Sequence, residues 1–130
     1  MTAPHIKVGE SGEDIAANFI QLKGYIILER NYRHHKAEVD IIALHKNTLV
    51  FIEVKTRSGK DYFHAEQAVS KAKQSLIYSA ASHYYQHILH KGPMRFDVIS
   101  VHLLPYGRDI YHFHDCFYPL QAGIIEDLNI

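Results

Sequence analysis

Residues Ala37 to Arg57, AEVDIIALHKNTLVFIEVKTR, decide the fold predicted for this chain. Two apolar runs rich in β-branched residues, Val39 to Leu44 and Thr48 to Val54, flank a polar His-Lys-Asn corner. Runs of this composition on either side of a short polar corner are typical of a β-hairpin. The stretch therefore predicts two antiparallel strands, which four charged residues interrupt: Glu38, Asp40, Glu53 and Lys55.

The register of this hairpin brings two acidic residues together. With Lys46 and Asn47 as the central turn residues, Asp40 lies directly opposite Glu53. Side chains alternate between the faces of a strand, so Asp40, Glu53 and Lys55 share one face. Carboxylates that lie directly opposite each other repel, and a hard divalent cation between them removes that repulsion. The hairpin therefore predicts a metal site.

Both faces of the hairpin are expected to be covered. The face with the acids also carries Ile42, Leu44, Leu49 and Phe51, and the opposite face is apolar too. Strands buried on both faces read as such near-continuous apolar runs. An ordinary hairpin with a solvated charged face is the alternative. Because acidic and basic residues are almost never buried without a partner, we interpret these charges as functional.

Composition indicates one globular domain spanning residues 1–130, with residues 1–10 as a loose lead-in. The 14 basic and 14 acidic side chains cancel, so net charge does not mark a nucleic-acid-binding protein. Basic residues nevertheless crowd around the hairpin, either as a rim for phosphates or as ordinary solvated surface. They are Arg30, Arg33, His34, His35, Lys36, Lys55, Arg57, Lys60, Lys71 and Lys73.

Cysteine usage and the N-terminal segment predict the compartment. Cys116 is the only cysteine, so an intramolecular disulfide is excluded and a reducing compartment fits. The first ten residues lack the apolar core of a signal peptide, and no run approaches the length of a membrane span. We expect a cytoplasmic protein that does not associate with membranes.

The remaining elements follow from periodicity and capping residues. Ser11 and Asp14 have the spacing of a helix N-terminus, and Gly24 is placed to end that helix near Lys23. Ser70 caps a second helix that extends to about His90. Strands are expected over 25–32, in the hairpin, and over 95–104 and 110–117. The prediction is an α/β domain with a mixed sheet of about five strands and two main helices, in the order α-β-β-β-α-β-β.

The residues Asp40 and Glu53-Val54-Lys55 form the pattern Asp, then Glu-x-Lys at hairpin distance. Metal-assisted hydrolysis of a phosphodiester needs such a set. Carboxylates hold Mg²⁺ or Mn²⁺, the ion polarises the phosphate, and an ammonium steadies developing negative charge. Because Mg²⁺ takes only one or two protein carboxylates, the sparse acidic set is adequate.

Taken together, these motifs resemble the YraN-like family of predicted endonucleases. That family has a restriction-endonuclease-like fold and a PD-(D/E)xK site and is similar to archaeal Holliday junction resolvases. The matching segments are Gly9-x-x-Gly12-Glu13-x-x-Ala16, Gly24-x-x-Ile27-Leu28-x-x-Asn31-Tyr32-Arg33, Glu38-Val39-Asp40-Ile41-Ile42, Val50 to Arg57, Val69-Ser70-x-x-Lys73, Arg95-Phe96-Asp97-Val98 and His112-x-x-Asp115-Cys116-Phe117. Two positions differ, with Ala37 where the family usually has Gly and Val39 where the wider superfamily has Pro.

The resemblance implies roles for individual residues. It makes Asp40, Glu53 and Glu13 the metal ligands and Lys55 the catalytic lysine, with Mg²⁺ or Mn²⁺ as the cofactor. Without it, Glu13 reads as a first-turn acid that complements the helix dipole. Further candidates for the second line of the site or for nucleic-acid contacts are Glu38, Arg57, Lys73, Arg33, Lys36 and Gln67.

The eleven histidines allow a different metal site. His83 and His87 are spaced i, i+4 on the expected second helix, and His112 and His114 share one strand face. No cysteine or acidic residue completes either pair in the sequence, whereas structural zinc needs four ligands at characteristic spacing. We therefore favour ordinary surface or half-buried histidines over zinc.

The sequence as a whole predicts a Mg²⁺-dependent nuclease that hydrolyses phosphodiester bonds in DNA, with branched or junction DNA as one substrate class. The alternative is a module of the same fold that binds nucleic acid without cutting it, and a partner-binding scaffold is a third reading. Junction cutting would favour a homodimer, by analogy alone.

Overall fold

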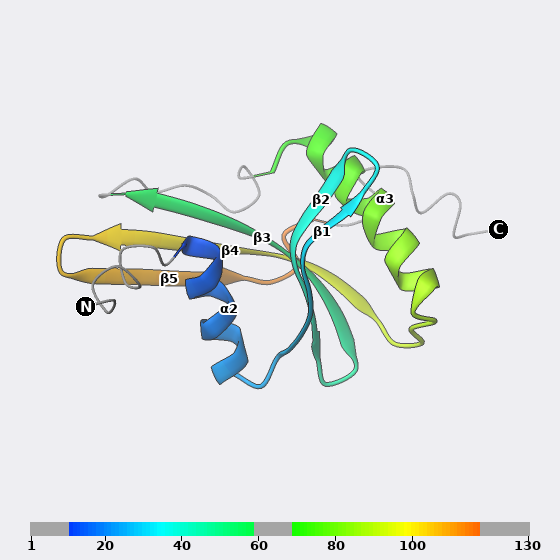
Figure 1. The fold of residues 1–130 in the computed structure, drawn as a ribbon, viewed down its shortest axis with the longest axis horizontal. Coiled ribbons are helices and arrows are strands. Elements are labelled where there is room, and N and C mark those ends of the chain that lie inside the picture. Colours follow the sequence, from blue (N-terminus) through cyan, green and yellow to red (C-terminus); the bar gives the residue numbers. More distant parts are fainter. Residues whose placement is uncertain (1–10, 59–68, 118–130) are drawn as a thin grey trace, which may run out of the picture.

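The computed structural model describes residues 11–58 and 69–117 (Figure 1). Its elements are α2 (Gly12–Leu22), β1 (Ile26–His34), β2 (Ala37–His45), β3 (Thr48–Ser58), α3 (Lys71–His87), β4 (Met94–Leu104) and β5 (Gly107–Phe113). The predicted α/β class and the order α-β-β-β-α-β-β are confirmed. The predicted lead-in over 1–10, the candidate Gln67 and Lys60 lie outside the described residues.

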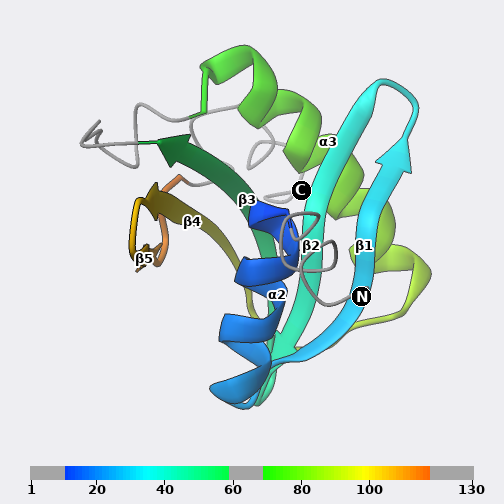
Figure 2. The ribbon, with the colours of Figure 1, turned by 60° about the vertical axis from the view of Figure 1, so that its left-hand side comes forward.

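The five strands form one mixed sheet in the order β1-β2-β3-β4-β5. Three neighbouring pairs are antiparallel, and β3 pairs with β4 in parallel. A parallel pair needs a crossover connection, which α3 supplies. The helices lie on opposite sides of the sheet, as Figures 1 and 2 show.

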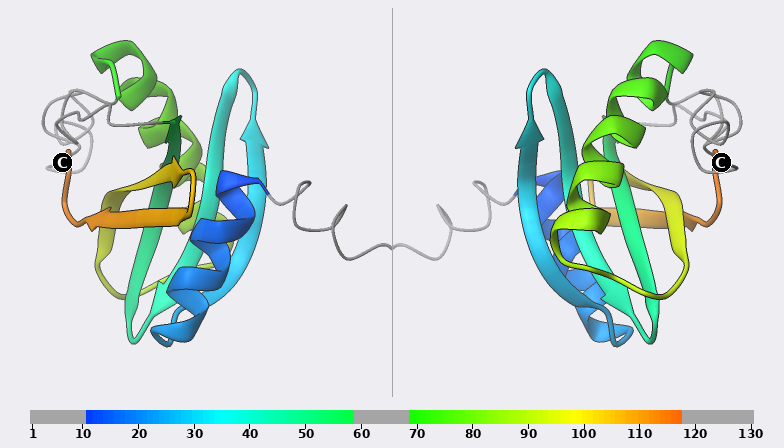
Figure 3. Two further views of the ribbon diagram at one scale, coloured as in Figure 1. Left: turned by 90° about the vertical axis from the view of Figure 1, so that its left-hand side faces the viewer. Right: turned by 90° about the vertical axis from the view of Figure 1, so that its right-hand side faces the viewer.

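A buried core fills each face of this sheet. Ile15 and Ile20 of α2 pack on Val50, Ile52 and Ile99. On the other face, Ile77 and Tyr78 of α3 join a second cluster, which includes Ile42, Phe51, Phe96 and Val98. The near-continuous apolar runs of β2 and β3 are thus covered on both sides, as expected. Figure 3 shows these two helical layers from opposite directions.

Helix α2 begins as predicted, with a capping box in which Ser11 accepts a hydrogen bond from the backbone of Asp14 and the Asp14 side chain accepts one in return. The helix docks so closely on β3 that a Cβ atom built on Gly12 would lie 1.8 Å from Thr56 Oγ1. Leu22, which belongs to the apolar positions of this helix, is 91% exposed because the chain turns back to the sheet just beyond it.

Helix α3 begins after Ser70, whose side chain accepts a hydrogen bond from Lys73 N. Ile77, Ala80, Ala81 and Tyr84 are buried, as helical periodicity predicts. Leu76 and Ile88 remain partly exposed, whereas Tyr78 is buried with only 1% of its surface exposed. Neither helix in the described part of the chain has the length and apolar character needed to cross a membrane.

The sheet divides at the middle of the β2–β3 hairpin. The predicted register is confirmed from the turn pair His45 and Thr48 out to Ile41 and Ile52. Beyond Ile52, β3 continues beside β4 as far as Ser58, while β2 stays paired with β1. Figure 1 shows these two halves of the sheet diverging. We call this point the fork, defined by Asp40 on β2 and by Glu53 and Val54 on β3.

Candidate functional site

The side chain of Asp40 bridges the two strands where they separate. Its Oδ2 accepts a hydrogen bond of 2.8 Å from the backbone N–H of Val54. The predicted backbone pairing of Asp40 directly opposite Glu53 is therefore wrong, because in the described residues the ladder stops one step earlier, at Ile41 and Ile52. A side-chain hydrogen bond replaces the backbone ladder here, and the acid stays at the fork.

Glu53 is the buried acid of the fork, with only 4% of its surface exposed. Its Oε2 accepts a hydrogen bond from Lys73 Nζ of α3 and lies 3.4 Å from Lys55 Nζ. Its Oε1 is buried and has no hydrogen-bond partner among the described residues. A buried carboxylate oxygen without a donor costs free energy unless a cation or donor approaches it. One oxygen of Glu53 is thus held by lysine, and the other has no hydrogen-bond partner among the described residues.

The raised pKa of Asp40 indicates that acidic groups converge at the fork. Burial raises the pKa of Asp40 to about 6, and the negative charge of Glu53 adds to the shift. Glu13 on α2 also contributes, in the same direction. Negative charges that raise the pKa of Asp40 in this way lie close to it, and a bound divalent cation would offset their repulsion. The buried, unpaired oxygen of Glu53 beside this carboxylate therefore fits a metal ion.

Glu13 reaches this region from the first turn of α2. Its Oε1 accepts hydrogen bonds from Arg30 (2.9 Å from Nη2 and 3.2 Å from Nε) and from Asn31 Nδ2 (3.0 Å) on β1. Asp14 pairs with the same guanidinium at 2.7 Å. Arg30, placed in the predicted basic rim, is thus committed to two acids and holds Glu13 in place.

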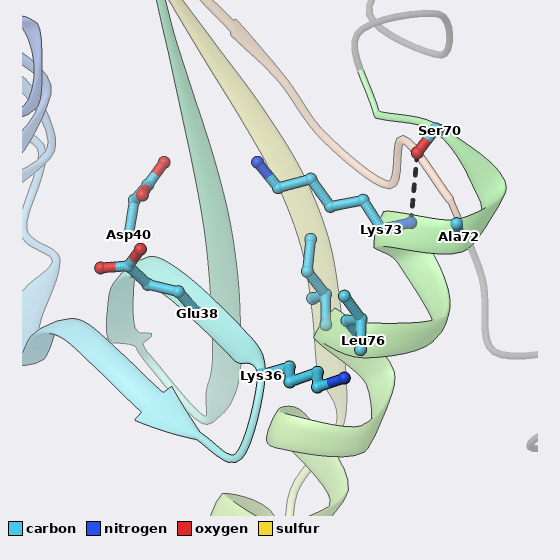
Figure 4. A pocket seen from close by; sticks show the side chains of 8 residues that line it. Lys36, Glu38, Asp40, Ser70, Ala72, Lys73 and Leu76 are labelled. Carbon is cyan, nitrogen blue, oxygen red and sulfur yellow. Dashed lines mark hydrogen bonds between the residues drawn. The ribbon is translucent and has the colours of Figure 1, made fainter.

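An open pocket of about 410 Å³ adjoins the fork between β2 and α3. Figure 4 shows Lys73 extending from α3 toward Asp40, with Glu38 beside that acid and Leu76 farther along the helix. The lining residues are Lys36, Glu38, Asp40, Ser70, Ala72, Lys73, Leu76 and Ile77. Four of the predicted site residues therefore meet at one cavity: Lys36, Glu38, Asp40 and Lys73.

Two predicted phosphate contacts lie less centrally. Arg33 is exposed and forms an ion pair of 3.5 Å with Glu38. Arg57 lies on β3, two residues beyond Lys55, and is half-buried. By strand alternation it faces the same side of the sheet as Lys55 and Glu53.

Sequence reasoning missed the contact that Lys73 makes in this site. Its ammonium contacts the buried acid directly. Burial works to lower the pKa of Lys73, but the hydrogen bond to Glu53 and the negative charges of Glu53, Asp40 and Glu38 together raise it. The signal available in the sequence was the spacing Ser70-x-x-Lys73. An N-cap serine places the third helical residue on the first turn, which here faces the fork.

A second polar cluster, Asp97 with His112 and His114, lies on the α2 side of the sheet. The sequence shows no acidic partner for this histidine pair, but the fold brings Asp97 within range of both rings. Asp97 is fully buried and already accepts hydrogen bonds from Arg95 (2.8 Å), His112 (2.7 Å) and the backbone of Asp115 (3.1 Å). Because Arg95 already binds this carboxylate, Asp97 has little hydrogen-bonding capacity left for a metal ion. The cluster instead joins β4 to β5.

Comparison with known proteins places this arrangement in a family. The family model described as uncharacterised protein family UPF0102 matches residues 12–101, which include α2, the fork and α3. A UPF0102 protein of Flavobacterium psychrophilum is 42% identical over 116 residues, covering 89% of this chain and 98% of its own length. A UPF0102 protein of Clostridium botulinum is 50% identical over 96 residues, covering 72% of this chain and 78% of its own. The chain thus belongs to the UPF0102 family, the YraN-like family that its motifs resemble.

Proposed function

We propose that this protein is a metal-dependent nuclease that hydrolyses phosphodiester bonds in DNA. One observation carries the proposal: the buried Glu53 keeps one carboxylate oxygen unpaired beside Asp40, while two lysines flank its other oxygen. Unpaired buried oxygens, converging acids and adjacent ammonium groups are the parts that phosphodiester hydrolysis needs. Strongly shifted pKa values in a cleft also favour a functional site over a structural one.

The acids and the lysine of this site would have different roles in the reaction. Asp40 and Glu53 would hold Mg²⁺ or Mn²⁺, with Glu13 as a further acid within electrostatic reach. When bound, such an ion polarises the phosphate and lowers the pKa of a coordinated water. Lys55, whose side chain is 23% exposed, would orient the attacking water or stabilise the negative charge that develops on the phosphate.

The surroundings suit a polyanion that enters from the open side. Lys73 and Lys36 line the pocket that leads to Asp40. They offer cations to phosphates on either side of the bond to be cut. The carboxylates remain deeper, on β2 and β3, because the fork opens between these strands. The cations that would bind phosphate thus lie beside the acids that would bind the metal.

The decisive experiment is cleavage of single-stranded, duplex, flapped and four-way-junction DNA by the purified chain in Mg²⁺ or Mn²⁺. We expect cutting of at least one substrate, and loss of about 10²-fold or more with Asp40→Asn, Glu53→Gln or Lys55→Ala. Glu29→Gln is the matched control, because Glu29 is an exposed carboxylate on β1, a strand that does not form the fork.

Two results would contradict the proposal: no cleavage of any substrate with either ion, or cleavage that the fork variants retain. Binding to DNA that weakens with salt and survives the loss of Asp40 and Glu53, without any cutting, would instead identify a non-catalytic binding module. Circular dichroism of each variant separates a lost activity from a lost fold.

A further inference from the structure

Four histidines from two distant segments of the chain meet on the surface beside α3. His34 ends β1 and His35 follows it, while His83 and His87 lie one turn apart on α3. The ring of His34 stacks on that of His83, with centroids 4.1 Å apart, and His35 contacts His34 at 4.3 Å. The rings of His83 and His87 are parallel within 7° and 6.2 Å apart. We call His34, His35, His83 and His87 the histidine cluster.

We propose that His34, His83 and His87 form a second metal site, one that takes a transition-metal ion of the zinc, nickel or copper class. Imidazole nitrogen suits these ions, whereas Mg²⁺ prefers oxygen ligands. The site is therefore chemically distinct from the carboxylates at the fork. Two ligands on one helix at i, i+4 and a third from a neighbouring element make an open site with three protein ligands.

The three rings lie near one another, but they must rotate before an ion can bind all of them, because the ligand atoms of His34, His83 and His87 do not all lie within 4.8 Å of one another. With a metal–nitrogen distance near 2 Å, two imidazoles around a tetrahedral ion have ring centroids about 5 Å apart. The contacts of 4.1 Å and 6.2 Å lie on either side of that value. His87 is exposed and His34 is only partly buried, so these two side chains have room to rotate toward Nε2 of His83.

Tyr32 supplies an independent observation. Its hydroxyl lies 3.0 Å from His83 Nδ1, so the opposite nitrogen, Nε2, is left for another partner. Metal-binding histidines commonly have their second nitrogen held in this way, which fixes the ring and its tautomer. Tyr32 is itself anchored against Tyr84, with ring centroids 5.0 Å apart. The contact with Tyr32 thus fixes the orientation of the His83 ring, as is common for a metal-binding histidine.

The cluster at Asp97, His112 and His114 is the competing location for such an ion. There the carboxylate already binds Arg95 through several hydrogen bonds, so an ion would have to displace a guanidinium from a buried acid. In the histidine cluster only one ring nitrogen, Nδ1 of His83, has a hydrogen bond among those between described residues. The transition-metal ion is therefore expected at the histidine cluster.

The test is calorimetric titration of the full-length protein with Zn²⁺ and Ni²⁺, in an Asp40→Asn background that removes a ligand from the fork. We expect one site, which His87→Ala and His83→Ala each weaken by about tenfold or more, and Tyr32→Phe by about tenfold. His114→Ala is the matched control and should leave the affinity unchanged, since it alters only the competing cluster. Electron paramagnetic resonance of bound Cu²⁺ should report more than one imidazole nitrogen.

His87→Ala keeps the test valid if His83→Ala disturbs folding, because His87 is exposed at the last residue of α3. Zn²⁺ and Ni²⁺ should also raise the melting temperature of the parent protein and not that of His83→Ala/His87→Ala. The proposal is overturned if neither ion binds, if His87→Ala binds as tightly as its parent, or if His114→Ala causes the larger loss. The outcome is independent of whether the fork cleaves DNA.

Discussion

Asp40 on β2 accepts a 2.8 Å hydrogen bond from the backbone N–H of Val54 on β3, at the point where the two strands stop pairing. The same carboxylate lies close enough to Glu53 for that charge to help raise its pKa to about 6, in addition to burial. Asp40 therefore has two opposing effects on the stability of the fold. It ties the strands together, and its ionised form is destabilised until a cation arrives.

Asp40→Asn should stabilise the metal-free protein near neutral pH. The raised pKa means that the folded state binds the proton more tightly, so the wild type loses stability as pH rises from about 4 to about 6 and stays at the lower level above that. Asn keeps an oxygen for Val54 N–H and removes the charge. We expect a gain of about 1–2 kcal/mol at pH 8, after a discount for partial exposure, and none below about pH 4.

Chemical denaturation in EDTA over this pH range measures the difference. Mg²⁺ or Mn²⁺ should then stabilise the wild type and not the variant, because only the wild type keeps both acids. A variant that is less stable than the wild type at pH 8 would show that the hydrogen bond to Val54 needs the charged form.

Lys73→Met should destabilise the metal-free protein by about 1–2 kcal/mol, since it leaves the buried Glu53 with Lys55 alone. The figure is kept low because the Lys73 side chain is 42% exposed. The pKa of Lys73 is raised, so this contribution is complete below pH 10.5 and is lost as pH rises through the higher folded value.

Lys71→Met is the control for this prediction, because Lys71 lies on the same turn and is exposed. Urea denaturation should give a value near zero for it. In a Glu53→Gln background the effect of Lys73→Met should largely vanish, and an undiminished effect there would assign the loss to helix packing rather than to the ion pair.

Much of this site follows from local sequence patterns. The register of the β2–β3 hairpin was predictable because its turn is short and its two faces are apolar, so a slip would expose the core. Alternation then places Glu53 and Lys55 on the same face of β3. The fork itself was not predictable, because it depends on β3 continuing beside β4 after its pairing with β2 has ended, and β4 follows some forty residues later.

The long-range contacts of the site depend on tertiary structure in the same way. Nothing in the spacing of Arg30, Asn31 and Glu13 indicates that they meet, since a helix and a strand must first pack together. Lys73 likewise reaches Glu53 only through the docking of α3. The family resemblance placed Glu13 and Lys73 among the candidates, whereas the residues alone favoured a helix-dipole role for Glu13.

Gly12→Ala should destabilise the protein by about 1–3 kcal/mol, although alanine normally favours a helix over glycine by about 1 kcal/mol. The reason is the 1.8 Å approach of the added Cβ to Thr56 Oγ1. Thermal unfolding checks the sign. Thr56→Ala should recover part of the loss, because the nearest of the clashing atoms disappears with the hydroxyl. Additive effects in the double variant would contradict the close approach of α2 to β3.

Asp97→Asn should be the most destabilising single change, at about 3–5 kcal/mol, with little effect on metal affinity at the fork. Asp97 is fully buried, and loss of its charge leaves Arg95 and His112 facing a neutral amide. Burial alone would raise the pKa of Asp97, but the hydrogen bonds from His112 and Arg95 lower it. Its contribution is therefore present above pH 3.8 and is lost as pH falls through the lower folded value.

Glu29→Gln serves again as the control. Urea denaturation at neutral pH should show most of the predicted loss of stability for Asp97→Asn and little for Glu29→Gln. Because Asp97 lies on the α2 side of the sheet and Glu53 on the α3 side, Mg²⁺ affinity of a folded Asp97→Asn sample should match the wild type. A large loss of that affinity would mean that the two faces of the sheet are coupled through β3 and β4, and that the buried Arg95–Asp97–His112 network positions the fork as well as supporting the fold.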